Sequence, residues 1–175
     1  MKGIKTLVSA AAIAVCLGAA SMASAASIII KDPDAPTGPV DGPFSTSAGQ
    51  IVVKSPSSLQ APVTCGITFT GNVSGGIATI NGASLTGGGL CALPVLKNIP
   101  SPGWVLTASS LTNGTVTNVG YTIASFPSTN CGPNTIAVTW NESTKTLSGS
   151  NIGLTGNCTI VSLSATAPKL SVTNP

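Results

Sequence analysis

The chain has 175 residues, of which 42% are hydrophobic and only 6% are charged. It contains no histidine and no arginine, and its lysines and acidic residues give a net charge of +3. A phosphate-binding surface needs clustered basic residues, so the few scattered lysines argue against nucleic acid as a partner.

Residues 1–25 have the pattern of a secretory signal peptide. Lys2 and Lys5 precede an apolar, alanine-rich stretch, and Ala23-Ser24-Ala25 supplies the small residues that signal peptidase reads. The apolar stretch is shorter than the roughly 20 residues that a bilayer-spanning helix needs. We therefore expect cleavage after Ala25, no membrane span in the mature chain, and a secreted protein, extracellular or on the outer surface of a bacterium.

Residues 26–50 are predicted to form a short apolar strand followed by a proline- and aspartate-rich arm. The apolar run is Ser27–Ile30, and residues 31–48 hold four prolines and three of the four acidic residues of the mature chain. Proline cannot donate to a β-ladder, so residues 31–48 are expected to be a mobile arm. The apolar strand would pair with its own sheet or with a neighbouring molecule. We favour its own sheet, and self-association stays open.

Residues 51–175 are predicted to form one all-β domain. Apolar and polar residues alternate over residues 67–70, 136–140 and 161–164, with the period of two that marks half-buried strands. Turn-forming residues interrupt these runs about every ten residues, with Asn113-Gly114 as the strongest hairpin signal. This pattern indicates an antiparallel β-sandwich or a barrel-like sheet.

Four cysteines remain after residue 25, and they form two matched pairs. Cys65 and Cys91 have 25 residues between them, and Cys131 and Cys158 have 26. An even number in an exported chain indicates disulfides, and the wide spacings without histidine argue against a metal site. The spacing suggests a duplicated hairpin, each copy closed by its own bridge (Cys65–Cys91 and Cys131–Cys158), although four cysteines allow three pairings.

The side chains of most enzyme mechanisms are missing, so no catalytic residue and no cofactor is predicted. Without histidine, neither a serine triad nor a cysteine–histidine pair can form. Glycoside hydrolysis needs two facing carboxylates, but Glu142 is alone in a predicted turn. A serine–lysine dyad would use Lys54-Ser55 or Lys145, which lie in exposed-looking segments. We expect a protein that is not an enzyme.

The two tryptophans differ in their sequence setting. Trp140 continues the alternation of residues 136–140 and is expected in the core. Trp104 follows Pro102-Gly103, and core packing and an exposed stacking platform for sugar are equally compatible with it.

The cysteine layout resembles that of the secreted bacterial protein activators of alkane oxidation. The resemblance covers roughly residues 1–25 and 60–173: the signal pattern, Cys65 followed by Thr68-Phe69-Thr70-Gly71, and a second hairpin that ends in Gly156-Asn157-Cys158. It implies a non-catalytic accessory protein that promotes bacterial use of n-alkanes, with an oil–water interface or the cell surface as its partner, by helping cells contact oil or disperse it as an emulsion. Residues 31–48 have no counterpart in this pattern.

A second hypothesis is a structural subunit of a cell-surface fibre or biofilm matrix. Low charge, high β content and the apolar strand at residues 28–30 would suit strand donation into a neighbour's sheet. A third, a carbohydrate-binding module, depends on exposure of Trp104.

Overall fold

The computed structural model describes residues 26–31 and 40–174. The strands and short 3-10 helices are β1 (Ser27–Ile30), β2 (Gly42–Ser45), β3 (Gly49–Lys54), η1 (Pro56–Ser58), β4 (Val63–Ser74), β5 (Ile77–Thr86), η2 (Gly89–Ala92), β6 (Val95–Leu96), β7 (Trp104–Ala108), β8 (Asn113–Ile123), β9 (Thr129–Asn141), β10 (Thr146–Leu154), β11 (Cys158–Thr166) and β12 (Leu170–Thr173). The predicted signal peptide, residues 1–25, lies outside the described residues.

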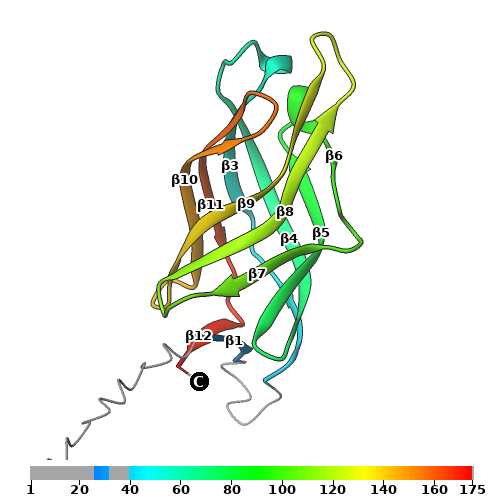
Figure 1. Cartoon of the computed structure of the whole chain (residues 1–175). Coiled ribbons are helices and arrows are strands. Elements are labelled where there is room, and N and C mark those ends of the chain that lie inside the picture. The colour runs from blue at the N-terminus through cyan, green and yellow to red at the C-terminus, as the bar shows by residue number, and fades with distance from the viewer. Residues whose placement is uncertain (1–25, 32–39, 175) are drawn as a thin grey trace, which may run out of the picture.

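The fold is a closed antiparallel barrel of eight strands (Figure 1). From β3 onward each long strand pairs with the next one along the chain, and the last, β11, pairs with the first, β3. This is the up-and-down arrangement, in which closure leaves no open edge in the ring. The predicted all-β fold is confirmed, in its barrel form.

Alternation of side chains places the core inside the ring. Along β4 the buried residues are every second one, Cys65, Ile67, Phe69, Gly71 and Val73, while the residues between them face outward and are largely Thr, Asn and Ser. Strand β9 repeats the pattern with Ile136, Val138 and Trp140. The period of two read from the sequence is therefore the in–out alternation of barrel strands.

The barrel has an upper and a lower end that carry different elements. The upper end carries η1, η2, the β8–β9 loop and the β10–β11 loop, and the lower end carries β1 and β12 (Figure 1). At the lower end, β4 and β5 are joined by Gly75 and Gly76, whose φ angles of 57° and 83° suit a two-residue hairpin turn. The lower end is also where the described chain begins and ends.

Strand β1 closes the lower end. It pairs antiparallel with β12 of the same chain, with Ile28 opposite Val172. Ile28 donates its backbone N–H to the carbonyl of Gly76 at 3.0 Å, and its side chain is only 2% exposed. The apolar run at residues 27–30 is thus paired within its own chain.

Strand β2 lies inside the segment that was expected to be a mobile arm, residues 31–48. It pairs with the lower half of β4, and Phe44 is buried against Gly71. Pro43 is tolerated because β2 pairs on one side only, so its missing N–H costs no ladder bond. The proline density of residues 31–48 indicated an unpaired segment, and the burial of Phe44 against β4 was not predicted. Residues 32–39 lie outside the described residues.

Glu142, in the β9–β10 turn, ties this turn to β12. Its carboxylate accepts hydrogen bonds from Trp140 Nε1 at 2.7 Å and from the backbone N–H of Val172 at 3.3 Å, and also from Lys145 and Ser171. Burial acts to raise the pKa of Glu142, but these donors outweigh it and lower the pKa from its ordinary 4.5 to about 2. The ionised carboxylate therefore stabilises the lower end.

Truncating Ile28 should destabilise the protein more than truncating its neighbour. Ile28→Ala removes a buried side chain and should lower the free energy of unfolding by about 2–4 kcal/mol. Ile29→Ala, on the other face of β1, is the control and should cost less than about 1 kcal/mol. Denaturant unfolding of both variants as monomers measures this. Unchanged monomer stability combined with lost self-association would mean instead that β1 pairs between molecules.

Glu142 should give the protein a pH-dependent stability. Because the pKa of Glu142 is lower in the folded than in the unfolded chain, its contribution is complete above about pH 4.5 and is lost as the pH falls toward 2. Since the carboxylate is partly exposed, Glu142→Gln should cost only about 1 kcal/mol at pH 7 and less toward pH 2.

Thermal unfolding of wild type and Glu142→Gln between pH 2 and 7 tests this. Asp41→Asn at the same end is the control, because asparagine keeps an oxygen that can accept from the backbone N–H of Gly75. A stability difference between Glu142→Gln and wild type that does not change with pH would contradict it.

Candidate functional site: the interior of the barrel

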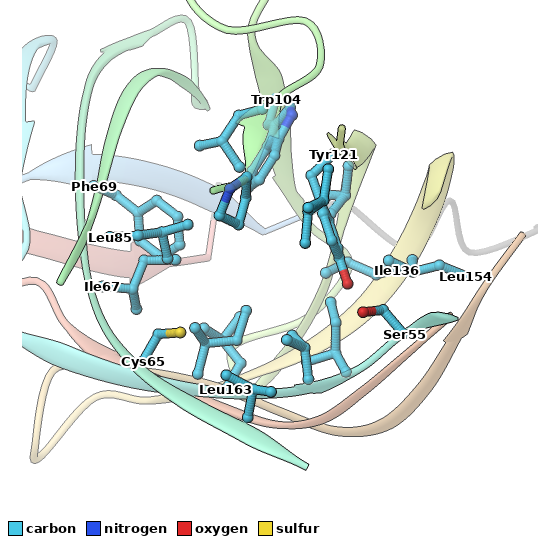
Figure 2. Close-up of a pocket in the computed structure, with 18 of the residues that line it drawn as sticks. Ser55, Cys65, Ile67, Phe69, Leu85, Trp104, Tyr121, Ile136, Leu154 and Leu163 are labelled. Carbon is cyan, nitrogen blue, oxygen red and sulfur yellow. The ribbon is translucent and has the colours of Figure 1, made fainter. Parts of the chain in front are cut away.

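The upper half of the barrel encloses an apolar cavity. Its volume is about 70 Å³, counted as the space open to the centre of a water molecule, several times the 10–15 Å³ or so that one water needs. Figure 2 shows the side chains that surround it, among which are Phe69, Trp104, Ile136 and Leu163. All eight strands of the ring contribute inward-facing residues to this lining, and β4 and β8 contribute the most.

The cavity reaches toward the surface at the upper end. The lining residues there, Ser57 and Ser58 of η1, Leu90 of η2 and Pro94, are only partly buried. At the lower end, by contrast, Ile28 of β1 and Leu170 of β12 pack with Trp140 and Leu147 around a much smaller space of about 20 Å³. The interior is therefore closed below, and its approach to solvent lies above.

Two hydroxyl-bearing side chains face each other inside the cavity. The Tyr121 hydroxyl points toward Ser55 across the apolar lining (Figure 2). Tyr121 is 8% exposed, its oxygen is fully buried, and no protein atom lies in hydrogen-bonding geometry with it. Burial raises the pKa of the Tyr121 phenol, and a hydrogen-bonding contact with the Ser55 side chain offsets only part of this rise. The phenol is neutral, and its contact with Ser55 falls short of a well-formed hydrogen bond.

Ser55 lies deeper than the sequence indicated. It was placed in an exposed-looking segment, but it is buried at the end of β3 and lines the cavity. The reason is that Ser55 has an extended backbone, so it continues the inward face of Ile51 and Val53. Lys54 does not line the cavity, and its side chain points to the opposite face. The structure thus gives no geometry for a Lys54-Ser55 dyad.

Both tryptophans are buried. Trp104 lies in the cavity wall, 6.2 Å from the ring of Phe69, and its Nε1 donates to the carbonyl of Lys97 at 2.8 Å. Trp140 packs at the lower end and donates to Glu142. The exposed stacking platform considered for Trp104 is therefore wrong, and the carbohydrate-binding hypothesis loses its only support.

Two disulfides hold the upper end together. Cys65 of β4 is bonded to Cys91 of η2, and Cys131 of β9 to Cys158 of β11, with Cα–Cα distances of 5.6 and 5.9 Å. Each bridge spans one hairpin. The second cysteine of each bridge has a different structural setting, because Cys91 lies outside the sheet and Cys158 begins a barrel strand. Duplication of the hairpin stays a prediction. The disulfides indicate an oxidising environment.

The described residues, 26–31 and 40–174, contain no group of three or more His, Cys, Asp or Glu side chains placed to hold a metal ion. Within the same ranges, no helix has the length and apolar character required to cross a membrane.

Sequence reasoning missed the Tyr121–Ser55 pair. The available signal was that Tyr121, the single tyrosine of the chain, alternates with Val119 and Ile123 as an inward-facing residue.

These features define a small disulfide-bonded β-barrel with an apolar interior. Comparison with protein families then identifies its kind: the family model described as alkane oxidation protein activator PraA/PraB-like matches residues 1–174. The chain belongs to this family, which confirms the resemblance seen in the cysteine layout. The family name, an activator, suggests a non-catalytic role. No curated protein and no solved structure matches the chain.

Removing the Tyr121 hydroxyl should stabilise the protein. Tyr121→Phe keeps the ring in the cavity wall and deletes a buried polar group whose contact with Ser55 falls short of a well-formed hydrogen bond. We expect the free energy of unfolding to rise by about 1 kcal/mol. Denaturant unfolding measures the change. A decrease of similar size would show that the hydroxyl is hydrogen-bonded in solution and that the cavity is organised differently around it.

Proposed function

We propose that this protein is an exported, non-catalytic accessory that promotes bacterial use of n-alkanes by acting at the oil–water or cell–oil interface. The observation that carries the proposal is a set of exposed apolar side chains at the upper end, around the approach to the cavity. Family membership supplies the link to alkane oxidation, and the position of these side chains supplies a means of contact with oil.

The exposed side chains form what we call the apolar rim, defined as Leu59, Leu93, Val95 and Phe126. Their exposed fractions are 79%, 46%, 67% and 102%. They come from four separate stretches: the segment after η1, the residue after η2, β6 and the β8–β9 loop. Transfer of such a side chain from water to an apolar phase is favourable by about 1.5–3 kcal/mol. The lower end has three exposed apolar side chains of its own, Val40, Ile77 and Leu111, which are on the whole less exposed, at 59%, 43% and 43%. The molecule would therefore orient with its upper end toward an oil surface.

Charged side chains are also distributed unevenly between the two ends of the barrel. Within residues 40–174 the acidic side chains are Asp41 and Glu142, and both lie at the lower end. Near the upper end lie Lys54, the last residue of β3, and Lys97. The Nζ of Lys97 is bonded to Asn130 Oδ1 at 2.5 Å and to the carbonyl of Gly132 at 2.6 Å. An end with few charged groups can approach oil at low cost, because few ions must lose their water.

Export and the absence of catalysis are supported from the sequence. Residues 1–25 have the pattern of a secretory signal, and the disulfides suit an oxidising compartment. The chain has no histidine, and the cavity wall is almost entirely apolar. A protein that presents alkane to the cell, or disperses it, needs adsorption and not bond breaking.

The fibre-subunit hypothesis lacks the structural feature that motivated it. Its motivation was a free apolar strand at residues 28–30, and that strand is paired with β12 of the same chain. The barrel ring is also closed by the β11–β3 pairing, so the ring itself has no open sheet into which a neighbour's strand would insert.

Purified protein should stabilise a hexadecane-in-water emulsion in buffer without added metal or cofactor, and the apolar rim should be responsible. Replacing Leu59, Val95 and Phe126 together with Ser should make the emulsion break several-fold faster than with wild type, measured by turbidity. The matched control replaces Val40, Ile77 and Leu111, the exposed apolar residues of the lower end.

The control variant should behave like wild type, and circular dichroism should show that both triple variants are folded. If the two triple variants behave alike, the rim is not the contact surface. If wild type stabilises the emulsion no better than a charged protein of similar size, the interfacial function itself is wrong.

A further inference from the structure

We propose that the cavity binds a straight alkyl chain that ends in one neutral hydroxyl, that is, a primary alcohol, with the hydroxyl held at Tyr121. This deepens the proposed function and rests on it for the source of the ligand, because adding oxygen to the terminal carbon of an alkane gives a primary alcohol. The chemistry of the ligand follows from the cavity itself.

The cavity wall indicates a ligand that is mostly hydrocarbon. Its lining is built from Ile, Leu, Val, Phe and Trp side chains, with Tyr121 and the serines of residues 55–58 as the polar exceptions. Burial of each methylene of a ligand is favourable by about 0.8 kcal/mol. The cavity is also too large for a single water and has a partly exposed approach at the upper end.

Tyr121 indicates that the ligand carries one polar group. Buried hydroxyls almost always have a well-formed hydrogen bond, yet the Tyr121 oxygen has only its imperfect contact with Ser55. A ligand hydroxyl placed beside Tyr121 would bond the Tyr121 oxygen and lie near the Ser55 hydroxyl. An alkane would leave the Tyr121 hydroxyl with the Ser55 contact alone.

The position of Tyr121 fixes the orientation of the ligand. Strand β8 runs from the lower to the upper end, so Tyr121 lies near the upper end and Val116 lies deeper (Figure 1). Ser55 adjoins η1 at the same upper level. The hydroxyl of the ligand therefore lies close to the approach, and its chain extends downward between Phe69, Trp104 and Ile136.

Charge selects the alcohol over the acid that further oxidation would produce. Among the described residues no lysine lines the cavity, and Lys97 is bonded elsewhere. A carboxylate would enter an apolar space without a cation, which is strongly unfavourable. The cavity is thus suited to the first oxidation product and not to a fatty acid.

Binding is tested with purified full-length mature protein and the series hexan-1-ol, octan-1-ol and decan-1-ol, each below its solubility limit. Fluorescence of Trp104, in the cavity wall, reports occupancy. Affinity should rise with chain length, by on the order of fourfold per methylene while the cavity fills. Octan-1-ol should bind several-fold more tightly than n-octane, and octanoate should bind more weakly than either.

Tyr121→Phe should lower the affinity for octan-1-ol about three- to tenfold and leave n-octane unchanged. Ser55→Ala is a second variant at the same point and should act in the same direction. Thr122→Val is the matched control, because it also deletes one hydroxyl from β8 but at a position that does not line the cavity.

No saturable binding by any alcohol would overturn the inference, and so would an equal effect of Tyr121→Phe on octan-1-ol and n-octane. Both results are independent of the emulsion assay. An active emulsifier that binds no alcohol would refute only this inference. Alcohol binding by a protein that does not adsorb to oil would refute only the interfacial function.

Discussion

The pairing of β11 with β3 is the constraint on which the rest of the structure depends. It joins Gln50 to Ser164 and so connects the two ends of the strand series across more than a hundred residues of chain. Once this pairing closes the ring, every second side chain of eight strands must share one interior of fixed width. Trp140 and Leu147 fill the lower part, and the upper part keeps open space between Phe69, Tyr121 and Leu163.

The two ends of the barrel are stabilised by different kinds of interaction. The lower end is covered by β1 and β12, with Ile28 in the core and Glu142 as a hydrogen-bond acceptor for four donors. The upper end relies on two disulfides that fix η2 and the start of β11. Covalent bonds can hold loops in place without filling the space beneath them. The cavity lies at the end where disulfides, and not packed side chains, hold the loops.

Much of the fold was predictable from the sequence, because it depends on the local alternation of apolar and polar residues. The candidate site was not predictable, because it forms only when the barrel ring closes. Period-two patterns and the four cysteines predicted strands and disulfides, and both are present. Asn113-Gly114 marked the correct hairpin, but the turn is at residues 109–112 and Asn113 begins β8. Phe44, Ser55 and Trp104 were misjudged or left undecided, since their burial is decided by strands distant in sequence.

The pairing of β1 with β12 also places the beginning and the end of the described chain side by side, on the far side of the molecule from the cavity approach (Figure 1). A tag or a surface linker attached after Thr173 would therefore hold the barrel upright, with the upper end directed into the medium. The closeness of β1 and β12 would allow a circular permutation that joins these two strands directly. A molecule attached in this way would have its cavity open at the end opposite to the attachment point.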